Sequence, residues 1–178
     1  MATINKSILN KNNFRLLIDR IPTVEYYVQT VNIPGLTMNE TIMSTRIGLE
    51  GYFPGDKITF DTLDITFLVD EDLANFKEMY DWMDAIVPVK DTSAYSNLVG
   101  GTSTSTNVVA NKAAGMEQYS DITLVMNTNK NIPNKYFRFH DCFPLTLGAL
   151  ELQSGADAEP VTSSVTFRFS YYDIANTS

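Results

Sequence analysis

The sequence has little cysteine and little histidine. Cys142 is its single cysteine, which excludes a disulfide within the chain and leaves only a pairing between two chains. His140 is its single histidine, so no pair of histidines can hold a metal ion. We therefore expect neither a disulfide framework nor a histidine-based metal site.

Positive charge is also scarce, with 13 Lys and Arg side chains against 21 Asp and Glu and a formal net charge of −8. Proteins that bind nucleic acid tightly present a basic surface to the phosphates, so tight binding is not expected. An acidic surface instead keeps DNA from adhering. The same charge also serves solubility, and charge alone does not distinguish the two roles.

Long apolar runs are missing. No stretch approaches the roughly 18–20 apolar residues that a membrane-spanning helix needs. The polar segment Met1–Lys11 lacks the apolar region of a secretory signal. We expect a protein that does not insert into membranes and that folds in the cytoplasm.

The composition does provide a large core. The chain of 178 residues is 44% hydrophobic and contains ten Phe and nine Tyr. This length is typical of one domain, so a single domain over residues 1–178 is expected. Only 19% of its residues are charged, against roughly 25% in typical soluble domains. The surface must therefore be rich in Thr, Ser and Asn or be buried against partners.

Strand patterns dominate the chain. Runs of β-branched and aromatic residues, several with a period of two, lie between turns marked by Pro, Gly and Asn. The expected strands are Asn13–Ile18, Val24–Val31, Ile58–Val69, Asp121–Asn127, Lys135–Asp141 and Val161–Tyr172. The pattern predicts a mainly β protein.

A weakly apolar segment, Thr37–Leu49, precedes the strong strand Ile58–Val69. We expect the two to form a long extended hairpin, with a turn at Gly55–Asp56, whose outer part has no core of its own. A strand edge of this kind normally needs protection or a partner.

One helix is expected over about residues 70–86. Asp70 or Asp72 is placed to cap its start. The expected apolar face consists of Leu73, Phe76, Met79, Tyr80, Met83 and Ile86, with Trp82 at its margin. Two segments lack such patterns: residues 1–11 form an N-terminal arm, and residues 91–115, rich in Ser, Thr, Asn and Gly, are expected to form a long flexible loop.

Catalytic patterns are weak. His140 and Cys142 lie two apart on an expected strand without a third group to orient them, so a nucleophile–base pair is disfavoured. Asp61 and Asp64 face opposite sides of a strand, which argues against a paired acid and base. The acidic run 70–72 lacks the further ligands that Ca²⁺ requires, and no glycine-rich phosphate motif is present. We expect no enzyme activity and no cofactor.

The order of these elements resembles the tail tube protein family of contractile-tailed bacteriophages. The resemblance covers most of the chain outside residues 91–115 and rests on the Gly55–Asp56 pair leading to Val69–Asp70–Glu71, on Tyr80–Asp81–Trp82, and on Phe143–Pro144–Leu145. The matching stretches are NNFRLLIDRIP, VNIPGLT, PGDKITFDTLDITFLVDED, NFKEMYDWM, KYFRFHDCFPLTLGALELQSG and VTSSVTFRFSYYDI.

This resemblance implies a β-sandwich or barrel-like tail tube fold with one packed helix. It implies hexameric rings that stack into a hollow tail tube, through which DNA passes without specific binding during genome delivery. Sheath, baseplate initiator and tape-measure proteins would be partners in the virion tail, which is assembled in the host cytoplasm. The long loop and the N-terminal arm leave open a tube initiator, completion or baseplate adaptor protein with the same fold. From another class, a cell-surface or carbohydrate-binding β-sandwich is the alternative.

Ring or stacking contacts are expected on the weakly apolar hairpin. The residues we select are Glu40, Thr41, Thr45, Glu50 and Asp56. A hairpin without its own core is more easily explained as a strand pair that joins a neighbouring subunit than as part of a monomer.

Overall fold

The computed structural model describes residues 8–25, 27–44, 46, 48–89, 118–155 and 159–176. The predicted loop 91–115, residues 1–7 of the predicted arm and Thr45 lie outside this part of the chain. Strands make up most of the regular structure in the described residues, and α2 (Ala74–Ile86) is its long helix. The prediction of a mainly β protein is confirmed.

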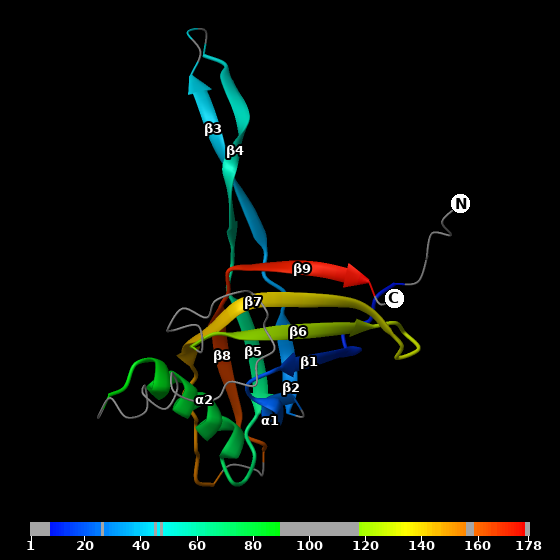
Figure 1. The fold of residues 1–178 in the computed structure, drawn as a ribbon, viewed down its shortest axis with the longest axis vertical. Helices are drawn as coiled ribbons and strands as arrows, with labels where there is room; N and C mark the ends of the chain where they lie inside the picture. The colour runs from blue at the N-terminus through cyan, green and yellow to red at the C-terminus, as the bar shows by residue number, and fades with distance from the viewer. Residues whose placement is uncertain are drawn as a thin grey trace, which may run out of the picture.

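The main sheet is antiparallel throughout, and β1, β2 and β9 each pair with a single strand among the described strands (Figure 1). Its order is β1 (Phe14–Ile18), β6 (Ser120–Asn127), β7 (Pro133–Leu147), β8 (Thr162–Arg168), β5 (Leu63–Leu68) and β2 (Val28–Asn32), with β9 (Tyr171–Asn176) paired to β7. The first half of β7 pairs with β6 and β9, and its second half pairs with β8. Asp141 lies between these halves with φ of 55°, so one long strand joins two parts of the sheet.

The core is formed by alternate residues of these strands. Leu63, Ile65 and Phe67 of β5 are fully buried, as the period of two in their sequence predicts. Phe139 of β7 and Phe167 of β8 are buried in the same cluster. Side chains from these three neighbouring strands therefore share one hydrophobic core.

Two of the predicted strands are divided in the structure. The predicted strand Ile58–Val69 is split at residues 61–62 into β4 (Glu50–Phe60), which belongs to the hairpin, and β5 of the main sheet. The backbone N–H of Asp61 donates to the carbonyl of Gly35 over 3.2 Å and closes the base of the hairpin. The predicted strand Val161–Tyr172 is likewise divided at residues 169–170 into β8 and β9, which run in the same direction and pair with the second and the first half of β7.

The predicted strand Val24–Val31 is wrong in its first half. Residues Pro22–Glu25 form a helical turn, α1, and β2 begins only at Val28. Proline is favoured in the first turn of a helix because the N–H groups there have no acceptor within the helix, so the N–H that proline lacks is not needed. Within this turn the side chain of Val24 is fully buried. The Glu25 carboxylate accepts a hydrogen bond from Arg15 Nε of β1 over 2.5 Å.

The helix is confirmed, and its buried face differs from the prediction. It begins at Ala74 and not at residue 70, and Leu73 occupies the N-cap position. The Oδ1 atom of Asp70 accepts the N–H of Ala74 over 2.7 Å, as expected of a capping carboxylate. The buried residues are Asn75, Met79 and Trp82, which lie at helical spacing. Leu73 and Tyr80, both predicted for the apolar face, are exposed, whereas Trp82 lies in the core and not at its margin.

Candidate assembly surface

The long hairpin is confirmed and stands away from the main sheet (Figure 1). Its strands are β3 (Leu36–Ser44) and β4 (Glu50–Phe60), and among the described strands they pair only with each other. Every residue of β3 is exposed. A two-stranded hairpin alone is at best marginally stable in water, so this one lacks the support that a sheet normally needs.

The hairpin carries large apolar side chains on both faces. Ile42 lies opposite Tyr52 on one face, while Phe53 lies opposite Thr41 on the other. Ile42 is 54% exposed and Tyr52 is 62% exposed. The exposed large apolar residues are Leu36, Met38, Ile42, Met43, Leu49, Tyr52, Phe53 and Ile58. Large apolar side chains exposed in such number on one element are typical of a protein–protein contact.

The turn of the hairpin lies elsewhere than the sequence indicated. Ser44 pairs with Glu50, so the chain reverses between these residues. Gly48 supplies the left-handed backbone there, with φ of 74°. Gly55 and Asp56, predicted as the turn, lie within β4.

Four of the five predicted contact residues are described, and all four lie on this hairpin. Glu40 is opposite Pro54, and Thr41 is opposite Phe53. Glu50 lies at the outer end and accepts a hydrogen bond from the Tyr52 hydroxyl over 2.9 Å. Asp56 lies in an irregular part of β4. Thr45 is outside the described residues.

The apolar residues of the hairpin were missed as contact residues. Only polar residues were selected, although Ile42, Tyr52 and Phe53 are the large exposed side chains around them. The sequence signal that could have identified them is their alternation with Thr, Ser and Gly. An apolar residue that has no core to face is most easily explained by contact with a partner protein.

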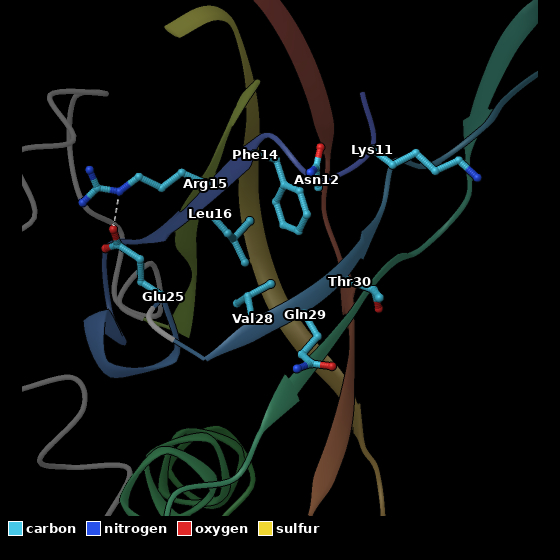
Figure 2. A pocket seen from close by; sticks show the side chains of 9 residues that line it. All are labelled: Lys11, Asn12, Phe14, Arg15, Leu16, Glu25, Val28, Gln29 and Thr30. Atoms are coloured by element: carbon cyan, nitrogen blue, oxygen red, sulfur yellow. Dashed lines mark hydrogen bonds and ion pairs between the residues drawn. The ribbon is translucent and has the colours of Figure 1, made fainter. Parts of the chain in front are cut away.

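A second surface lies between the two ends of the main sheet (Figure 2). It is a groove of about 610 Å³ between β1 and β2, with Phe14, Leu16 and Val28 among its lining residues. The Arg15–Glu25 ion pair crosses one side of it. Each of these strands has one edge without a partner among the described strands. Such edges suit backbone contact with an extended chain.

His140, the possible base for Cys142, lies between two carboxylates. The Nδ1 atom of His140 lies 3.4 Å from a carboxylate oxygen of Asp121, and its Nε2 atom lies 3.5 Å from one of Asp173. The ring stacks on Tyr171 with centroids 4.6 Å apart. Both ring nitrogens therefore face carboxylates. Burial, and then the negative charge of Asp121, raises the pKa of the Cys142 thiol far above its ordinary value.

Cys142 is accordingly expected to be chemically inert in the folded protein. The thiolate is the reactive form, and both the raised pKa and the full burial of this side chain suppress it. Alkylation by iodoacetamide at pH 8 should be at least about 100-fold slower in the native protein than in urea. Rapid labelling of the native protein would show that the thiol is accessible and activated.

Metal and membrane sites are not evident in the part of the chain that the structure describes. No group of three or more His, Cys, Asp or Glu side chains there is arranged to hold a metal ion. None of the described helices is long and apolar enough to cross a membrane.

Solved structures with a similar fold come from contractile injection machines. A chain of the PVC sheath–tube complex of an extracellular contractile injection system superposes with a TM-score of 0.60 at 10% identity, covering 97% of this chain and 95% of that one. A chain of the PVC sheath/tube terminator gives 0.62 at 11%, covering 96% and 99%. The tube-terminating cap of the anti-feeding prophage gives 0.58 at 12%, covering 99% and 100%.

Comparison of the sequence with protein families identifies the family of the chain, whereas the similar structures show only its fold. No curated protein shows significant similarity to the sequence. The family model described as phage tail tube protein matches residues 3–175, which covers the hairpin, α2 and all of the strands described above except the last residue of β9. The chain therefore belongs to the phage tail tube protein family.

Proposed function

We propose that this protein forms hexameric rings that stack into the hollow tube of a contractile phage tail. The observation that carries the proposal is the projecting hairpin, whose eight large apolar side chains are exposed and whose strands pair only with each other among the described residues. In a ring these side chains would be covered by a neighbouring copy. Closure would also give the free strand edges partners.

The tube serves as the conduit for the phage genome during delivery. The net charge of −8 suits a passage through which DNA slides, because attractive contacts to phosphates would slow it. Glu40, Thr41, Thr45, Glu50 and Asp56 contribute polar contacts between subunits. Sheath, baseplate initiator and tape-measure proteins are its partners in the virion tail, which assembles in the host cytoplasm. The role assigns no catalysis to the chain.

A second candidate is a ring that starts, completes or ends the tube. The similarity in fold to a sheath/tube terminator and to a tube-terminating cap supports this second candidate. Such a ring has one face on the tube and does not polymerise. Growth without limit separates a tube subunit from this alternative.

Negative-stain electron microscopy of the purified protein across a concentration series tests both candidate functions. Hollow tubes are expected above a threshold concentration, with smaller species below it. Discrete rings that never stack would support the terminating or initiating role. A monomer at every concentration, even after addition of preformed tube fragments, would contradict the proposal.

A further inference from the structure

The hairpin contains an irregular step part-way along its length. Met38 pairs with Ile58, but Glu40 pairs with Pro54, so Asn39 alone lies opposite Gly55, Asp56 and Lys57. The side chain of Asn39 fills the step, because its Oδ1 accepts the backbone N–H of Lys57 over 2.8 Å. Such a β-bulge bends the strand that carries it and increases the local twist.

Gly55 is required here by close approach of the facing strand. A Cβ atom at residue 55 would lie 2.3 Å from the backbone oxygen of Asn39, a separation that only a backbone shift can relieve. Gly51 of the same strand differs, since its nearest contact would be Phe53 Cε2 at 3.5 Å, an ordinary van der Waals distance. The bulge therefore depends on glycine at one of these two positions only.

The base of the hairpin is fixed to the body of the protein. Leu36 pairs with Phe60 at this end, and the Phe60 ring packs against Phe169 and Tyr172 at 5.6 and 5.4 Å. In Figure 1 the two strands cross between this base and the tip. The bulge thus lies between this fixed base and the outer half of the hairpin, which carries Ile42 and Tyr52.

We propose that Asn39 and Gly55 are positioning residues that aim the outer half of the hairpin at the neighbouring subunit. The inference rests on the proposed assembly, because it identifies what orients that surface. A closed ring requires the same contact angle at every subunit, and a changed angle leads to open or failed assembly. Neither residue needs to touch the neighbour to have this effect.

The aim of the hairpin can be measured in the protein below its assembly concentration. Spin labels at Ser44→Cys and Glu151→Cys, both exposed positions, report the distance from tip to body, while the buried Cys142 is not labelled. Gly55→Ala is expected to shift or broaden this distance distribution, and Gly51→Ala is expected to leave it unchanged. Equal distributions in the wild type and Gly55→Ala would overturn the inference, whether or not the protein assembles.

Assembly provides the second readout. Gly55→Ala is expected to raise the threshold concentration for tubes by at least about tenfold, with an unchanged melting temperature of the core. Gly51→Ala should stay within about twofold of the wild type. Asn39→Ala, which removes the hydrogen bond to Lys57 without a steric clash, should raise the threshold in the same direction. Wild-type protein that never assembles contradicts the proposed function instead, and the distance measurement still decides the role of the bulge.

Discussion

Replacing Trp82 with alanine is expected to lower the free energy of unfolding by about 3–5 kcal/mol. Trp82 is only 3% exposed, and its ring packs against Phe167 with centroids 5.9 Å apart. Its indole N–H donates to the carbonyl of Gln118 over 3.1 Å. The substitution removes the packing, leaves a cavity between α2 and β8, and takes a donor away from that carbonyl. Urea unfolding below the assembly concentration measures the loss, because ring formation would otherwise add to the apparent stability.

Tyr80→Ala is the matched control. Tyr80 is another aromatic residue of α2, two positions away, and it is 51% exposed. Its replacement is expected to change the free energy of unfolding by less than about 1 kcal/mol, since little packing is lost. If the two variants lost similar amounts of unfolding free energy, the helix would pack through the face predicted from its apolar residues, which includes Tyr80.

The phase of the helix could not be predicted because a polar residue occupies its buried face. Asn75 is fully buried, and its amide donates to the carbonyl of Leu68 over 2.8 Å, which ties the helix to the end of β5. A search for apolar spacing passes over such a residue and includes Leu73 and Tyr80 instead. The role of Asp70 could be predicted because a carboxylate that accepts a free N–H is a local effect, whereas the helix begins four residues later than predicted, after Leu73 with its left-handed backbone.

The strands show a similar division. β1 and β6 match their predictions closely, since apolar alternation within one strand is a local pattern. The break within Ile58–Val69 contains neither Pro nor Gly, so it was missed. In the sequence, the break is visible only as a change in which alternate residues face the core. Phe60 packs against the core and has an even residue number, whereas the buried residues Leu63, Ile65 and Phe67 have odd ones.

Four of the five selected contact residues lie on the hairpin, but its large apolar side chains were not selected. Weak apolar character beside a strong strand is a local signal, and it predicted a hairpin without a core. The position of the turn was wrong because both Gly48 and Gly55 are consistent with a turn in the sequence. Only the strand register distinguishes the glycine that needs a positive φ from the one that needs space.

A double substitution on the hairpin, Ile42→Glu with Tyr52→Glu, is expected to abolish assembly while the subunit stays folded. These side chains lie opposite each other on one face of the hairpin and are more than half exposed. In the proposed ring they would be covered by a neighbour, and burial of two unpaired carboxylates costs several kcal/mol. The threshold concentration should therefore rise by more than about 100-fold, measured by sedimentation and electron microscopy.

Leu152→Glu controls for added charge, because Leu152 is a large apolar residue that is exposed far from the hairpin in the sequence. This variant should assemble close to the wild-type threshold. In the double variant the melting temperature should be unchanged, since the hairpin contributes none of the buried core residues. Loss of assembly together with loss of folding would mean that the hairpin supports the subunit itself. Normal tubes from the double variant would mean that this face is not buried between subunits, and the exposed apolar residues would then need a partner other than a second copy of the chain.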